Sequence, residues 1–397
     1  MLGTHLLRIG ILASATLLSS VQAATLREAL DRAWAVQADQ LNARDQQFAA
    51  QVVASQAWTP QPPSIGLSNT TDQFNTDQGR REWEVGVSTP IWLPGQRDQA
   101  KTVATTERTA FSGRSALNRW QLAGQLRESW WAVRFAEADL ANADRQLEAA
   151  QLLAKDVTQR VKAGDLAALD ENQTRIGIQQ AKRQQGMATL NLQRSRETFA
   201  LISSGATLPE QQESLGTAPA LEQHPLLSSL QAATQSAQAR LEQATGDTRD
   251  APELALTYTS ERNEREEPYR GRITLGITVP LGTESRNRPR ITAANADWIE
   301  AQTTRDLERR RIAADISAAR LELSQSQQLQ ALASEEFRLV KERTAWIDKG
   351  FRLGQFDLMT HMRSQQEQLE AQFQVTGAEQ AVGRAISRVN QAAGITP

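Results

Sequence analysis

Apolar and polar residues alternate with a period of two in both halves of this chain, which is the pattern of β-strands with one apolar face. The apolar positions are Trp83, Val85, Val87 and Ile91 in the first half, and Leu254, Leu256, Tyr258, Ile273, Leu275, Ile277 and Val279 in the second. Each strand has about 9–11 residues, the length that crosses a bilayer when a strand is tilted. We therefore predict β-hairpins at about 63–92 and about 252–281. Their four strands would leave open edges, so other copies of the chain must complete any membrane barrel.

Long stretches beside the hairpins follow a seven-residue apolar repeat, which is typical of packed helices. Residues 96–162 contain no Pro, and about 67 residues at 1.5 Å each would form a rod of roughly 100 Å. One seam carries Leu126, Val133, Leu140, Leu147, Ala154 and Val161, and the other carries Ser129, Ala136, Ala143, Ala150 and Val157. A second long helix is predicted at about 291–348, where Gln330 and Thr344 interrupt the repeat. For the helices alone, an ordinary antiparallel coiled coil is the alternative.

The chain presents this order of elements twice, about 190 residues apart. Pro63–Arg97 aligns with Pro252–Gly282, and Arg160–Asp170 aligns with Gly350–Thr360, so that Gly164 lies over Gly354. Each repeat would begin with a helix that precedes its hairpin. We predict one structural repeat at 24–204, with its tip turn near 164 and a last helix to about 203. The other spans 205–397, with its tip turn near 354 and a last helix to about 393. A hairpin at one end of each long helix pair predicts a tube rather than a globule.

The first 23 residues have the pattern of a secretory signal peptide. Arg8 precedes a short apolar stretch, and Val21 and Ala23 supply the small side chains that a signal peptidase requires before Ala24. The apolar stretch is too short to cross a bilayer as a helix. A buried N-terminal helix is the alternative interpretation.

Composition excludes several classes of function. Without the signal peptide the chain has 43 basic and 46 acidic residues, because Arg8 is the one basic residue lost, so no nucleic-acid partner is expected. The chain has no Cys, which excludes disulfides, zinc–thiolate sites and Cys nucleophiles. Only His224 and His361 follow the signal, and no nucleophile motif, phosphate loop or metal-ligand spacing occurs. We expect neither an enzyme nor a bound cofactor or metal, and no apolar run long enough for a transmembrane helix follows the signal.

Two passages that recur in both halves carry a resemblance to a known family. They are the strand-to-helix passages, Thr89–Lys101 and Thr278–Ala296, and the glycine turns, Val161–Lys182 and Phe351–Gln372. With the duplicated architecture, they resemble the TolC family of outer-membrane efflux channels across essentially the whole mature chain. The strand-to-helix passages are most similar to the heavy-metal, cobalt–zinc–cadmium-type subgroup, although residues 94–97 read Pro-Gly-Gln-Arg where that subgroup has Gly-Gly-Lys-Arg.

The resemblance implies a mainly α fold with a small β part. Duplicated long-helix hairpins would form a periplasmic helical barrel, and four transmembrane strands per chain would contribute to a trimeric 12-stranded β-barrel in the outer membrane. The implied function is the exit duct of a tripartite efflux system, with heavy-metal cations among the candidate substrates. The implied partners are two further copies, a periplasmic adaptor (membrane-fusion) protein, an inner-membrane pump of the RND type and outer-membrane lipid. The alternatives are a periplasmic coiled-coil scaffold or adaptor, and the outer-membrane duct of type I protein secretion.

The resemblance also assigns candidate site residues at the two helix reversals. The periplasmic tips that would contact the adaptor are Gly164, Asp165, Leu166, Gly354, Gln355 and Phe356. A plain helix–turn–helix, in which Gly is needed only to end a helix, is the alternative. Asp170 and Thr360 fall at the implied constriction, where three copies of Asp170 would form a carboxylate ring. The alternative for Asp170 is a solvated acid at a helix start.

One short cluster, residues 359–362, combines Met, His and Met side chains that would suit Cu(I). Met at helical spacing is more often a core residue, and Met359 and Met362 share a helix face that His361 does not. We therefore expect Met359 to pack in a helix interface and predict no metal site.

Overall fold

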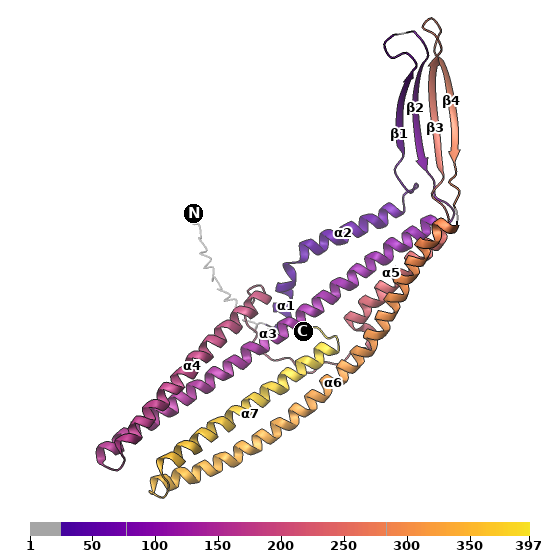
Figure 1. Cartoon of the computed structure of the whole chain (residues 1–397). Helices are drawn as coiled ribbons and strands as arrows, with labels where there is room; N and C mark the ends of the chain where they lie inside the picture. The colour runs from indigo at the N-terminus through magenta and orange to yellow at the C-terminus, as the bar shows by residue number, and fades with distance from the viewer. Residues whose placement is uncertain (1–24, 77, 283) are drawn as a thin grey trace, which may run out of the picture.

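The computed structural model describes residues 25–76, 78–282 and 284–397, and the predicted signal peptide, residues 1–23, lies outside them. The described helices are α1 (Leu26–Ala35), α2 (Ala38–Ser55), α3 (Gln96–Ala163), α4 (Ala168–Ile202), α5 (Pro225–Gly246), α6 (Glu284–Arg352) and α7 (Leu358–Ala392), with a short 3-10 helix at Leu221–Gln223. The strands are β1 (Ser64–Thr71), β2 (Arg81–Pro90), β3 (Glu253–Arg262) and β4 (Arg270–Thr278). The molecule is long, with the sheet at one end and the two helix reversals at the other (Figure 1).

The four strands form one antiparallel sheet in the order β1-β2-β3-β4, so β1 and β4 are its open edges. The central pair joins the two halves of the chain, since Val85 lies opposite Tyr258 and Val87 opposite Leu256. Because the period is two, the register collects the apolar side chains on one face: Ile65, Leu67, Trp83, Val85, Val87, Leu254, Leu256, Tyr258, Ile273, Leu275 and Ile277. All of them are exposed in the single chain.

The helices form a layer in which α3 and α6 run the full length (Figure 1). In the half near the sheet, α2 and α5 pack against α3, and α5 also packs against α6. In the other half, α4 packs along α3, α7 packs along α6, and α3 contacts α7. Gly113 permits the close approach of α5, because a Cβ there would lie 3.2 Å from the Ser229 Cα.

A compact core lies at the middle of the long axis, and we call this level the waist. Leu30 from α1 is fully buried there, together with Trp130 and Trp131 from α3. The Trp130 Nε1–H donates to the Pro209 carbonyl at 2.8 Å, and the Trp131 Nε1–H donates to Ser387 Oγ at 3.0 Å. The waist thus fixes the linker between α4 and α5, as well as α7, to α3.

The long helices follow the predicted seams closely. Leu126, Ser129, Val133, Ala136, Ala143, Ala154 and Val157 are buried. The interruption at Thr344 has a structural partner, since its hydroxyl donates to the Ser364 carbonyl at 3.2 Å and accepts from Ser364 Oγ at 2.9 Å. A buried hydroxyl pair therefore replaces an apolar contact at this level of the α6–α7 interface.

Two helix boundaries differ from the prediction. The second long helix begins at Glu284 rather than near Ile291, and Pro289 lies inside it. Pro removes one backbone donor, but Asn287 donates to the Asp247 carbonyl and Arg290 pairs with the Asp247 carboxylate at 3.1 Å. Asp247, the residue that follows α5, therefore holds this first part of α6. The helix predicted before the first hairpin is also divided, into α1 and α2, by a turn at Val36 and Gln37.

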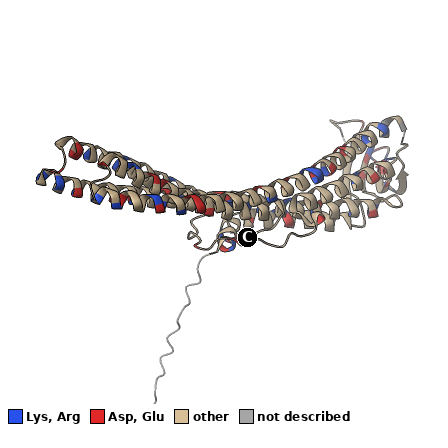
Figure 2. Cartoon of the chain, turned by 90° about the horizontal axis from the view of Figure 1, so that it is seen from below, with Lys and Arg blue, Asp and Glu red and all other residues tan. Residues whose placement is uncertain are grey.

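Charge is distributed evenly along the helices. Figure 2 shows basic and acidic residues mixed over both halves, without a face of one sign. Within the described part of the chain, no helix combines the length and apolar character that crossing a membrane requires.

Candidate functional site

Both helix reversals are built on a glycine in the left-handed region. Gly164 ends α3 with φ +87°, and Gly354 follows α6 with φ +73°. The next residue closes each turn, because the Asp165 N–H donates to the Arg160 carbonyl at 2.9 Å and the Gln355 N–H donates to the Gly350 carbonyl at 2.8 Å. A Cβ on either glycine would have no heavy atom within 4 Å, so backbone conformation rather than space favours glycine here.

The tip residues assigned from the sequence lie at these turns with different exposures. Asp165 and Gln355 are exposed, and Phe356 is 44% exposed with its ring against Gly350. Leu166 is partly buried against an apolar cluster that joins the two reversals. The turns therefore present a polar rim around a partly apolar centre.

The helices that leave the two turns are capped by different acids. In α4, the Asp170 carboxylate accepts the Ala167 N–H at 3.1 Å. In α7, the Asp357 carboxylate accepts the Thr360 N–H at 3.0 Å. Hydrogen bonds from the Thr360 side chain and from its backbone N–H lower the pKa of Asp357. Asp170 is thus a helix-capping acid within one chain, whereas Thr360 is the residue that the capping acid Asp357 contacts. Whether three Asp170 side chains form a ring depends on further copies, so the constriction remains a prediction.

An apolar cluster at the tips, which we call the tip cluster, connects the two halves of the chain. Its buried members are Val157 of α3, Phe351 of α6 and Leu358 of α7. The Phe351 ring contacts two side chains. The Arg160 guanidinium lies 4.6 Å from the centre of the ring. The His361 ring stacks on it, with a distance of 4.4 Å between the ring centres and an angle of 11° between the ring planes. No pattern in the sequence singled out Phe351, although it lies seven residues after Thr344 in the same repeat.

His361 is buried by this stack and its Nε2 lies 3.2 Å from Asp348 Oδ1. Burial raises the pKa of Asp348, but the Arg352 and His361 side chains lower it overall. Met362 packs in the tip cluster, whereas Met359 is exposed, so the expectation that Met359 is a core residue is wrong for the single chain. The two thioethers do not share a pocket with His361, and the described residues contain no group of three or more His, Asp or Glu side chains that could hold a metal ion.

The sheet provides the second candidate site, at the opposite end of the molecule. Its apolar face is fully open, while its other face carries small and polar side chains around a hollow of about 290 Å³. Gly66, Glu84, Gly86, Ser88 and Thr257 line this hollow. A sheet that exposes apolar side chains on one face and polar ones on the other suits a wall between lipid and water.

Comparison with known proteins places these features in context. No family model matches the chain. The cobalt-zinc-cadmium resistance protein CzcC of Cupriavidus metallidurans is 23% identical over 315 residues, which cover 76% of this chain and 75% of CzcC. Solved outer-membrane channels also match. CusC has a TM-score of 0.76 at 14% identity, with 95% of this chain and 96% of CusC covered.

The open state of the Neisseria gonorrhoeae MtrE channel has a TM-score of 0.75 at 14% identity, covering 94% of this chain and 89% of MtrE. The Campylobacter jejuni CmeC channel has a TM-score of 0.73 at 15% identity, covering 93% and 85%. These matches extend over both the sheet and the helical layer. They confirm the predicted resemblance: the chain has the fold of the outer-membrane channels of the TolC family.

Proposed function

We propose that this chain is the outer-membrane exit duct of a tripartite efflux system. Substrates would enter at the helix reversals, pass through a helical tunnel and leave through a barrel to which each chain contributes its four strands. The similarity to a cobalt-zinc-cadmium resistance protein favours heavy-metal cations as substrates.

The observation that carries this proposal is the open apolar face of the sheet. Eleven large apolar side chains, from Ile65 to Ile277, share that face without any covering element in the described chain. Contiguous exposed apolar surface of this kind marks a binding or membrane surface. Strands of 8–10 residues also match the thickness of a bilayer when they are tilted. A soluble periplasmic scaffold would leave this face in water at a high cost in free energy.

The open edges of the sheet support a homotrimer. β1 and β4 have unpaired backbone groups along one side, which lipid cannot satisfy. Because β1 and β4 run antiparallel, β4 of one copy can pair with β1 of the next, and three copies give a closed barrel of twelve strands.

The helix reversals are the proposed contact for a periplasmic adaptor, which would connect the duct to an inner-membrane pump of the RND type. The supporting features are the left-handed glycines, Gly164 and Gly354, and the exposed side chains of Asp165, Gln355 and Phe356. These residues are the part of the molecule farthest from the sheet, where a duct anchored in the outer membrane would reach a periplasmic partner (Figure 1).

Membrane insertion tests the proposal most directly. The protein is expected in the outer-membrane fraction after a carbonate wash, and Val85→Asp together with Leu275→Asp should prevent its insertion. The matched control is Ser88→Asp with Thr274→Asp, which places the same charges on the polar face. Recovery of the wild-type chain as a soluble periplasmic protein would contradict the proposal. Cation efflux is tested separately, by the zinc, cobalt and cadmium sensitivity of a deletion strain with and without the gene.

A further inference from the structure

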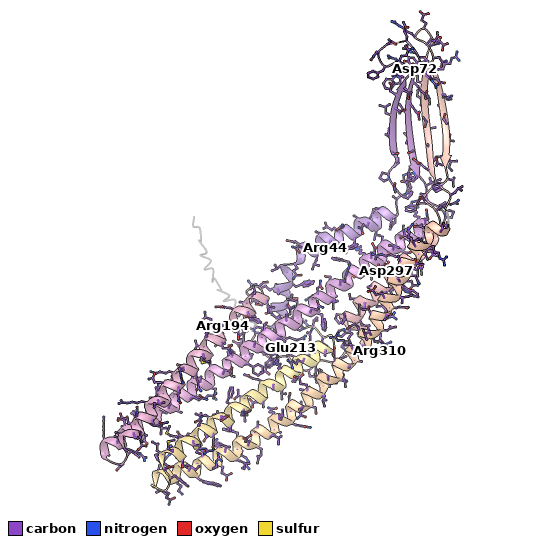
Figure 3. The ribbon with its side chains drawn as sticks, in the orientation of Figure 1. Arg44, Asp72, Arg194, Glu213, Asp297 and Arg310 are labelled. Carbon is purple, nitrogen blue, oxygen red and sulfur yellow. The ribbon has the colours of Figure 1, made fainter. Side chains whose placement is uncertain are left out.

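A hollow of about 360 Å³ lies between α2 and α3, in the half of the molecule near the sheet. Two arginines line it, Arg44 from α2 and Arg114 from α3, and Figure 3 shows Arg44 on its helix. We propose that this hollow, which we call the arginine groove, binds an organic anion with two or more carboxylates. The inference goes beyond the cations favoured above, and it rests on the proposed function only where it places the groove in the tunnel.

The positive charge of the arginine groove is open to a ligand. Among the residues that the structure describes, neither Arg44 nor Arg114 makes an ion pair or a hydrogen bond. Both side chains are exposed. Two guanidinium groups that line one hollow repel each other, and an anion between them would offset that repulsion.

The acids near the groove do not supply this anion. Each of them pairs with a different arginine: Asp45 with Arg108, Glu107 with Arg240, and Asp31 with Arg119. Asp39, the other acid of α2, lies five residues before Arg44 and therefore about 140° around the helix from it. The charges of the two groove arginines are thus available to an anion that enters from solution.

The groove combines hydrogen-bond donors with an apolar surface. The rings of Phe48 and Phe111 pack against each other in it, with 5.1 Å between their centres and 31° between their planes. Gln40, Ser115 and Asn118 also line the hollow and add amide and hydroxyl donors. A guanidinium matches a carboxylate with two parallel hydrogen bonds, so two arginines fit two carboxylates. The phenylalanine rings fit the carbon skeleton that joins such carboxylates, which a phosphate ion lacks.

The groove lies on the face of α3 opposite to the linker between α4 and α5. Trp130 donates to this linker at Pro209, and it follows Arg114 by 16 residues. At about 100° per residue, the Trp130 and Arg114 side chains leave the helix in directions that differ by roughly 160°. A tunnel stays open when the linker lies outside the wall of helices, so the groove would line the tunnel of the proposed duct. Anions that pass through the duct would then contact it.

Binding is measured by isothermal titration calorimetry with the purified full-length chain in detergent. Citrate, which carries three carboxylates, is expected to bind the wild type. Acetate and inorganic phosphate at the same ionic strength should bind about tenfold more weakly or not at all. Arg44→Gln together with Arg114→Gln should weaken citrate binding by about tenfold or more. Because both arginines are exposed, this double variant should keep the melting midpoint of the wild type.

The matched control is Arg194→Gln with Arg310→Gln, which removes the same charge from α4 and α6 (Figure 3). It should bind citrate as the wild type does. Three outcomes would each overturn the proposal: no citrate binding to the wild type, an equal loss of binding in the two double variants, or phosphate binding as tight as citrate binding.

A second measurement tests whether the groove lies on the tunnel wall. The chain has no Cys of its own, so Asn118→Cys adds a thiol at the groove and Ser214→Cys adds one on the linker. A negatively charged methanethiosulfonate reagent should change the reversal potential in planar bilayers for Asn118→Cys and leave it unchanged for Ser214→Cys. An unchanged potential for Asn118→Cys would overturn the position in the tunnel. A wild-type chain that forms no channels would count against the duct itself, while calorimetry would still decide whether the groove binds carboxylates.

Discussion

At the scale of single residues, His224 is the buried group whose titration should be visible in stability. It caps α5, because its Nδ1 accepts the Leu226 N–H at 3.2 Å, and its ring meets Trp120 edge-on at 5.0 Å. Burial lowers the pKa of His224, and a hydrogen bond with the Ala392 backbone opposes that effect only partly. The neutral imidazole is therefore the form that fits the folded waist.

This shift predicts a dependence of stability on pH. In the unfolded chain His224 takes up its proton near its ordinary pKa of 6.5, before the folded chain does. The contribution of His224 to the free energy of unfolding should be constant at higher pH and should fall as the pH drops below about 6.5. The melting midpoint in detergent, followed by helical circular dichroism, should be lower at pH 5.5 than at pH 7.5. His224→Asn keeps an N-cap acceptor and should remove most of this difference, and an unchanged difference in His224→Asn would show that another group causes it.

The tip glycines predict an effect on export rather than on assembly. Gly164→Val or Gly354→Val forces a β-branched residue into a left-handed conformation, at a cost of roughly 1–2 kcal/mol. That cost is too small to unfold the chain, but relaxation of the turn would displace the proposed adaptor contact. Metal sensitivity of a complemented deletion strain should return with normal trimer levels. Asn substitutions, which tolerate this conformation better, should retain resistance, and full resistance with Val at either site would show that the turns are tolerant.

At the scale of elements, the linker between α4 and α5 is held by a buried ion pair. Arg127 of α3 contacts Glu213 of the linker through two hydrogen bonds of 2.8 Å, and it also donates to Gln391 of α7. Figure 3 shows Glu213 at the middle of the long axis. Arg127→Met should destabilise the chain by about 3–5 kcal/mol, since it leaves a buried carboxylate unpaired. Adding Glu213→Leu should recover much of the lost free energy of unfolding, measured with a denaturant. Failure to recover it would mean that the ion pair stabilises the fold more than its apolar replacement does.

The sequence predicted those elements whose signal is local. The hairpins follow from the period of two, the long helices from the seven-residue repeat, and the reversals from Gly164 and Gly354. It missed features that depend on contacts between distant segments. The start of α6 before Pro289 depends on Asp247, and the linker depends on Trp130 and Arg127. Neither contact leaves a periodic pattern in the residues that make it.

The candidate site also contains one part that has a local signal in the sequence and one part that depends on contacts between distant segments. The glycine turns could be read from the repeat, because a helix reversal needs a left-handed residue at a fixed place. The stack of Arg160, Phe351 and His361 could not, since its members come from three helices and share no spacing.

At the scale of the whole molecule, the assembled duct should be cation-selective because of Asp170. Three copies would place three of these carboxylates around one axis near the tips, and close like charges favour the presence of a cation between them. Within one chain Asp170 also caps α4 through the Ala167 N–H, so a useful variant must keep that bond. Asn does so, because its side-chain oxygen accepts the same hydrogen bond without a charge.

Reversal potentials in planar bilayers under a salt gradient would measure this selectivity. Asp170→Asn should move the reversal potential toward zero, since each substituted trimer loses three negative charges at its narrow mouth. Asp165→Asn is the matched control: it lies at the same tip and is exposed, but its carboxylate makes no helix-capping bond in the described chain and should change the potential much less. An unchanged potential in Asp170→Asn would reduce the role of this residue to capping α4, and the charge that selects cations would then lie elsewhere along the tunnel.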